Sequence, residues 1–205
     1  MGMKRSILGV LAAVSVLAAW QVIAVTQAGP PPLLEHPWGP PQIAFDIPKT
    51  DIDTLLKNAP PAVDQQLRVV DMGKYNLSVG IIHRVATKEK PGDPISGPYH
   101  DNTAEVYIML SGSGVLTTGG SGEKKPGANY NILNGPGGNQ VADQRSVSRR
   151  AVAGDIIIIP PGVLHAWSQV TDHVTYLSVR PDPDRSLPGG YVHPLLMKNA
   201  MPAVK

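Results

Sequence analysis

The stretch from Gly154 to His165, GDIIIIPPGVLH, decides the fold. The glycine that opens it predicts a tight turn, and the four β-branched residues Ile156 to Ile159 predict a buried strand. The two prolines and Gly162 predict a second, sharp turn that aims His165 inward. A short strand between two such turns is typical of a small all-β domain.

A second informative stretch runs from Pro98 to Gly112, PYHDNTAEVYIMLSG. Because side chains alternate along a strand, two strands should each place three side chains on one face: Glu105, Tyr107 and Met109 on one, and His165, Trp167 and Gln169 on the other. If both faces point inward, they enclose a mainly apolar cavity with a few convergent polar groups. That composition is typical of a small-molecule pocket.

The composition of the chain agrees with a β-rich domain. The 205 residues include 21 Gly and 21 Pro, which is too much turn chemistry for a helical bundle, while 42% hydrophobic residues exclude a disordered chain. There is no Cys, which excludes a disulfide scaffold, a thiol nucleophile, a Cys-based zinc site and an iron–sulfur cluster. His and carboxylate groups therefore remain as the metal ligands to consider.

Further short strands and one helix are expected along the chain. A helix capped by Thr50 or Asp51 should run to about Asn58. Short strands are predicted at 67–70, 77–85, 105–110, 115–118, 156–159, 165–170 and 174–179. A turn is expected at 111–114, a loop at 88–98 and a long polar excursion, a candidate lid, at 119–150. In the strand 77–85, His83 shares the apolar face.

The two quoted stretches resemble the two motifs of the cupin superfamily, the small jelly-roll β-barrels. His100, Glu105 and Gly112 fit the second half of the first motif. The second motif is matched at four positions: Gly154, Pro160, Gly162 and His165. Two positions depart from the pattern, since Pro98 replaces the first histidine and Gln169 replaces the final asparagine.

The resemblance implies a divalent metal ion, Fe, Mn or Zn, held by His100, Glu105 and His165. Two imidazoles and one carboxylate form the facial set associated with non-heme Fe(II), and they also suit Zn or Mn. Because Pro98 removes one ligand, His83 is a candidate replacement. A structural role is the alternative for each: a salt-bridged surface acid for Glu105, a satisfied core group for the histidines.

The resemblance also favours a metal-dependent enzyme acting on a small organic molecule, of oxygenase or lyase type. Tyr107, Tyr99 and His83 are the candidate proton-transfer residues, with core packing as the alternative. Arg149, Arg150 and Arg180 can grip a carboxylate, but solvated surface is the favoured interpretation for each. A cupin that binds a sugar or organic acid without turnover is the alternative function, and an envelope-associated module is a third. No role is expected for three other histidines: His36, His173 and His193.

The N-terminus has the layout of a secretory signal peptide. Lys4 and Arg5 precede an uncharged apolar run over residues 7–25 and small residues at positions 26 and 28. We expect cleavage and a periplasmic or secreted protein, with an uncleaved anchor as the alternative. The signal holds two of the 18 basic residues and none of the 16 acidic ones, so the mature chain has a net charge of zero. Neither nucleic acid nor, after cleavage, a membrane is an expected partner.

Four parts are therefore predicted: a signal peptide (1–28), a Pro-rich arm with a short helix (29–65), a cupin barrel (66–180) and a C-terminal tail (181–205). The arm can lie over another surface or be a disordered linker. Barrel packing, or an arm that crosses to a second subunit, would give a homodimer.

Overall fold

A computed structural model describes residues 44–59, 64–90, 92–128 and 131–197. The chain divides into two units, residues 1–30 and 31–205, and every described residue belongs to the second. The predicted signal peptide, most of the predicted arm and His36 lie outside the described residues. Within the described ranges, no helix has the length and apolar character required to cross a membrane.

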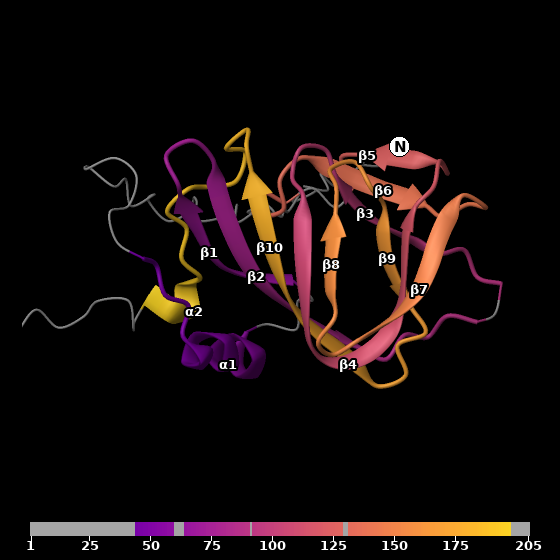
Figure 1. Ribbon diagram of the computed structural model, residues 1–205, viewed down its shortest axis with the longest axis horizontal. Helices are drawn as coiled ribbons and strands as arrows, with labels where there is room; N and C mark the ends of the chain where they lie inside the picture. The colour runs from indigo at the N-terminus through magenta and orange to yellow at the C-terminus, as the bar shows by residue number, and fades with distance from the viewer. Residues whose placement is uncertain (1–43, 60–63, 91, 129–130, 198–205) are drawn as a thin grey trace, which may run out of the picture. The chain divides into compact units, whose positions relative to one another are not determined.

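The described residues form two antiparallel sheets and two short helices (Figure 1). The larger sheet has the order β1 (Asp64–Asp71), β2 (Asn76–Val85), β10 (His173–Asp182), β4 (Glu105–Gly119) and β7 (Ser146–Val152), and β4 also pairs with β8 (Ile156–Ile159) and β9 (His165–Ser168). The smaller sheet has the order β3 (Ser96–His100), β6 (Gly137–Val141) and β5 (Lys124–Pro126). This confirms the predicted all-β jelly-roll barrel.

Strand β4 organises the barrel. Its first half pairs with β10 and β8, and its second half pairs with β7 and β9. The turn predicted at 111–114 is wrong, because the strand runs through it and bends at Gly112, whose φ is 74°. A Cβ at this position would lie 1.9 Å from the carbonyl oxygen of His173, so only glycine allows β4 and β10 to approach there.

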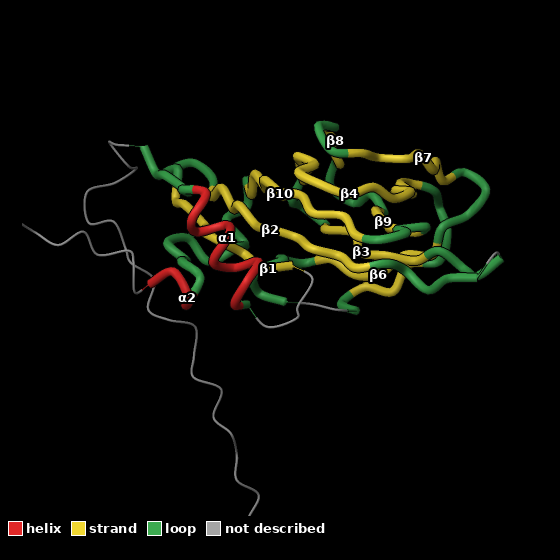
Figure 2. The backbone as a smooth tube through the Cα atoms, turned by 90° about the horizontal axis from the view of Figure 1, so that it is seen from below, coloured by secondary structure: helices red, strands yellow, loops and turns green. Residues whose placement is uncertain are grey.

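The larger sheet separates two apolar cores. One core fills the barrel and includes Tyr107, Trp167 and Tyr176. The other lies under the helices α1 (Lys49–Asn58) and α2 (Pro194–Met197), where Leu55 and Leu196 are buried. Figure 2 shows α1 beside β1 and β2. The predicted cap at Thr50 or Asp51 is wrong, because the helix begins at Lys49 and no side chain caps it.

The two faces of β2 point into different cores. Ile81 packs under the helices, whereas Ile82 packs inside the barrel. His83 lies on the same face of β2 as Ile81, and this face points away from the barrel interior. His83 is exposed, donates or accepts a hydrogen bond at Thr175 Oγ1 (2.8 Å) and stacks on His173. The prediction that His83 replaces a missing metal ligand is contradicted by this placement.

Two further segments differ from the expectations. Ile156 and Ile158 are 65% and 73% exposed while Ile157 and Ile159 are buried, so β8 is covered on one face only. The sequence predicts a polar excursion over residues 119–150, but this stretch contains β5, β6 and most of β7.

The segment after β10 returns to β1, where the Val69 N–H donates to the Tyr191 carbonyl (2.9 Å). The described part of this segment, residues 183–197, is thus packed against the fold.

Candidate metal centre

The two sequence motifs meet inside the barrel. His100 ends β3, Glu105 begins β4 and His165 begins β9. One ligand atom from each of these buried side chains lies within 4.8 Å of the other two. Two features bring the segments together: the Gly162 N–H donates to the His100 carbonyl (2.6 Å), and a Cβ at Gly97 would lie 2.7 Å from the His165 carbonyl oxygen. The Gly162 turn and the bare Gly97 backbone thus set the spacing of the centre.

The two imidazoles lie next to different oxygens of the Glu105 carboxylate. Nε2 of His165 lies 3.1 Å from Oε2 of Glu105, and Nε2 of His100 lies 3.6 Å from Oε1. The two rings have centroids 5.3 Å apart. Nδ1 of His165 lies 3.0 Å from the Val163 carbonyl oxygen, which only a protonated Nδ1 can satisfy. The lone pair of Nε2 in the neutral ring therefore faces Glu105.

The charges at the centre follow from burial. Burial lowers the pKa of His100 to about 4 and also lowers the pKa of His165, in each case against the attraction of Glu105. Burial acts to raise the pKa of Glu105, but Arg180 and the two histidines hold it well below its usual value. At neutral pH the centre therefore has two neutral imidazoles and one ionised carboxylate.

Three donors hold Glu105 in place. Oε1 accepts hydrogen bonds from Nε of Arg180 and from Ser178 Oγ (3.0 Å), and Oε2 accepts one from the Tyr107 hydroxyl (2.8 Å). Arg180 also pairs with Asp64 (2.6 Å). Arg180 is 2% exposed, so its predicted place on the solvated surface is wrong. The available signal was the period of two that continues from Tyr176 through Ser178.

The sequence matches no family model and no curated protein. Solved structures do match: a protein from Bacillus halodurans is 14% identical, covers 76% of this chain and 92% of its own, and has a TM-score of 0.44. A cupin family protein with a double-stranded β-helix fold from Methanocaldococcus jannaschii is 11% identical over 71% of this chain and 96% of its own, with a TM-score of 0.36. A recombinant oxalate oxidase in complex with glycolate is 16% identical over 64% of this chain and 55% of its own, with a TM-score of 0.37. These likenesses concern the fold alone.

The centre and the barrel around it agree with the fold expected from the sequence. Residues of both cupin-like motifs, far apart in the sequence, converge on the inner face of an antiparallel jelly-roll barrel. The chain has the cupin fold. Within the described residues, this barrel brings together the three predicted ligands His100, Glu105 and His165, and Pro98 lies in β3 where it pairs with Asn139.

The donor set of the cupin centre fits a divalent metal ion. An imidazole lone pair and a carboxylate oxygen 3.1 Å apart repel each other unless a positive charge lies between them. Glu105 has four acceptor positions, and Arg180, Ser178 and Tyr107 use three. The fourth position is on Oε2, the oxygen that lies 3.1 Å from Nε2 of His165. Two neutral imidazoles and one carboxylate oxygen are ligands that Zn, Fe and Mn accept.

A cavity of about 420 Å³ opens beside the cupin centre. Both histidines line it, together with side chains of the barrel wall and of the smaller sheet: Arg84, Tyr99, Tyr107, Asn139, Tyr176 and Arg180. This volume is within the range of small-molecule pockets. The centre and the cavity therefore form one site with access for a small ligand.

The candidate proton-transfer residues have different surroundings. Tyr107 is buried in the cavity wall, and its hydrogen is donated to Glu105; burial, with the Glu105 charge, raises its pKa well above 10. Tyr99 lines the cavity, and Lys124 Nζ lies 4.4 Å above its ring. Tyr99 and Tyr107 thus reach the site, and His83 does not.

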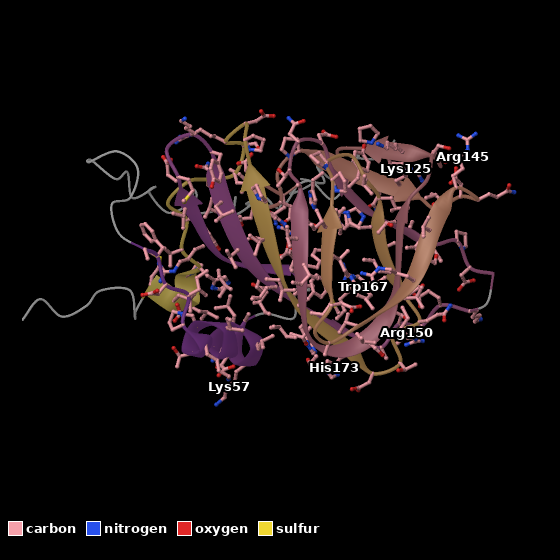
Figure 3. The ribbon with its side chains drawn as sticks, viewed as in Figure 1. Lys57, Lys125, Arg145, Arg150, Trp167 and His173 are labelled. Carbon is pink, nitrogen blue, oxygen red and sulfur yellow. The ribbon has the colours of Figure 1, made fainter. Side chains whose placement is uncertain are left out.

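Other residues considered from the sequence lie outside the site. Gln169 is exposed with a φ of 48°, so it does not share the inner face with His165 and Trp167. His173 bonds Ser111 and Asp172, and Figure 3 places it at the end of the barrel, away from the interior Trp167. Arg149 and Arg150 are exposed, as expected.

Proposed function

We propose that this cupin is a metal-dependent enzyme that acts on a small organic molecule, of oxygenase or lyase type, outside the cytoplasm. One observation carries the proposal: the lone pair of His165 Nε2 faces an ionised carboxylate at 3.1 Å, with a second neutral imidazole beside it and a cavity in front. A cation between these groups removes the repulsion. Fe, Mn and Zn remain the candidate ions.

The residues around the centre have separate roles in this proposal. His100, Glu105 and His165 hold the ion, which when bound supplies Lewis acidity or redox chemistry. Arg180 and Tyr107 fix the orientation of the Glu105 carboxylate, as second-layer partners do in metal sites. The Tyr99 hydroxyl forms no hydrogen bond with other described residues and is the candidate for proton transfer to or from a bound molecule.

The proposed location rests on the N-terminal sequence. Two basic residues, an uncharged apolar run and small residues before position 29 support export. N-terminal sequencing of the secreted or periplasmic protein tests this. A mature N-terminus near Gly29 is expected, whereas an intact Met1 in the cytoplasmic fraction would contradict it.

Metal content tests the proposed function. The protein is purified without chelators, its bound metal is quantified, and the metal-free protein is titrated with Co²⁺ and Zn²⁺. One ion per chain is expected, with affinity reduced at least tenfold in His100→Ala and His165→Ala. His83→Ala and His173→Ala are matched controls and should bind as the wild type does. A wild-type protein that holds no metal and does not rebind any would refute the proposal.

A binding protein without turnover is the second candidate. The buried pair between Arg180 and Glu105 favours it, because Arg180 already neutralises the carboxylate, and Pro98 stands where a further ligand is expected. The same titration separates the two candidates. A chain without metal affinity that still binds a small ligand in the cavity would support this second function.

A further inference from the structure

Arg84 is a charged side chain in the cavity that the proposed metal centre does not use. It lies on the barrel face of β2 and lines the cavity. Its Nε donates to the Tyr176 hydroxyl at 3.4 Å, and it forms no ion pair with any described carboxylate. Arg180 lines the same cavity, but its guanidinium is engaged by Glu105 and Asp64. The terminal N–H groups of Arg84 therefore face the cavity with hydrogen atoms to donate.

Tyr176 presents a second donor at the same place. Its hydroxyl oxygen accepts hydrogen bonds from Trp167 Nε1 (3.0 Å) and from Arg84 Nε. A hydroxyl has two lone pairs, so both are occupied and its own hydrogen must point elsewhere. Within the described residues no acceptor receives that hydrogen, and Tyr176 is one of the residues that line the cavity. Two donors without acceptors thus lie side by side.

The charge balance of the cavity points to an anion. Asp64 and Glu105 both bond Arg180. Arg84 balances the remaining negative charge only at a distance, and a divalent ion at the centre would leave the cavity with a positive excess. A bound anion compensates that excess. A carboxylate fits best, because its two coplanar oxygens match the fork of a guanidinium.

We propose that Arg84 and the Tyr176 hydroxyl form a receptor for a carboxylate group of the substrate, which makes the substrate a small organic acid. This inference rests on the proposed function, in which the reacting part of the substrate lies at the metal centre, at the other end of the cavity from Arg84. The ring of Tyr107 joins the two ends: its centroid is 4.3 Å from that of Tyr176 and 6.2 Å from that of His165. A molecule of a few carbon atoms spans this path.

The test uses a panel of small carboxylates, each paired with its neutral amide: acetate, propionate, malonate, succinate and benzoate. Binding to the full mature chain is followed by NMR titration, first on metal-free and then on zinc-loaded protein. The metal-free protein reports the receptor alone, because no ion is present to bind the carboxylate. At least one acid is expected to bind while its amide does not.

Variants assign the binding to the receptor. Arg84→Gln should weaken it at least tenfold, Arg84→Lys less, and Tyr176→Phe severalfold. Arg150→Gln removes an exposed arginine elsewhere and should leave binding unchanged, and circular dichroism verifies that each variant folds. Equal binding by wild type and Arg84→Gln, equal binding of acid and amide, or no binding by any acid at 100 mM would each overturn the receptor.

The receptor and the proposed function fail separately. Arg84→Gln should keep the wild-type metal stoichiometry. A chain without metal whose carboxylate binding depends on Arg84 would refute the metal-dependent enzyme and support the receptor. A chain that binds metal, and whose carboxylate binding is the same in wild type and Arg84→Gln, would refute the receptor and support the metal-dependent enzyme.

Discussion

The guanidinium of Arg180 bonds the carboxylate of Glu105 inside the barrel, between β10 and β4. Both side chains are at most 2% exposed. The pair keeps Glu105 ionised and leaves the free acceptor position on Oε2, the oxygen nearest to His165. A ligand held in this way is already oriented before a metal ion arrives, and such second-layer contacts set metal affinity.

We predict that Arg180→Met destabilises the metal-free protein by about 3–5 kcal/mol, because it leaves Glu105 buried without its strongest partner. A bound cation replaces the lost charge, so Zn²⁺ should raise the melting temperature of the variant more than that of the wild type. Arg149→Met removes an exposed arginine paired with Asp155 and should change stability by less than about 0.5 kcal/mol. Urea denaturation with and without Zn²⁺ measures both effects. Equal Zn²⁺ stabilisation of wild type and Arg180→Met would contradict the account.

Tyr107→Phe should lower metal affinity about tenfold while the barrel stays folded. The ring remains packed against Tyr176, but Glu105 loses one of its three donors. The lost hydrogen bond should cost about 1–2 kcal/mol of stability. Co²⁺ titration measures the affinity, and Tyr75→Phe, at an exposed tyrosine, serves as the control. The positioning role is wrong if Tyr107→Phe binds Co²⁺ like the wild type.

Gly112→Ala should destabilise the protein much more than Gly119→Ala. Both glycines have a φ near 73°, so each substitution brings a backbone strain of about 1 kcal/mol. Only at Gly112 does the new Cβ meet backbone, 1.9 Å from the His173 carbonyl oxygen, whereas nothing lies within 4 Å at Gly119. We expect a difference of at least about 2 kcal/mol in chemical denaturation. Equal losses would show that the bend of β4 does not need close approach at Gly112.

The metal-free protein should lose stability in acid over a defined range. The folded chain holds the pKa of His100 at about 4 against an ordinary 6.5, so the unfolded chain takes up a proton first as the pH falls. The contribution of His100 is therefore complete above pH 6.5 and is lost as the pH falls through 4, on the order of 3 kcal/mol in all. His165 acts in the same direction, and the lowered pKa of Glu105 adds a loss at still lower pH.

Urea denaturation between pH 4 and pH 7 checks this, with a chelator present. His100→Gln should show a flatter pH dependence than the wild type. Val174→Ala, a core variant that keeps every histidine, should run parallel to the wild type at lower stability. Parallel curves for His100→Gln and the wild type would contradict the buried, neutral state of His100.

Turn residues and a period of two predicted a small β-rich domain, and the resemblance to the two cupin motifs predicted the jelly-roll barrel and the three residues of the centre, because such motifs are short local patterns. It did not show which face of β2 points into the barrel. Ile81 and His83 share an apolar parity, but that face packs under α1, and only the tertiary arrangement distinguishes the two cores. Two apolar faces on one strand give no sequence signal of which is inside.

The sequence also did not predict which residues hold Glu105 in place. Arg180 is a charged residue beyond the expected end of a strand, and burial of such a group requires Asp64 and Glu105 from distant strands. The bend at Gly112 appears as a turn in the sequence, since glycine and serine favour both. Contacts between residues far apart in the chain decided each of these cases.

Anomalous X-ray diffraction from crystals soaked in Zn²⁺ or Co²⁺ tests the central claim most directly. We expect one strong anomalous peak between His100 Nε2, Glu105 and His165 Nε2, at about 2.0–2.2 Å from each ligand atom. Arg180 and Tyr107 should remain bonded to Glu105. A peak at His83 and His173 instead, or no peak beside an intact pair of Arg180 and Glu105, would contradict it.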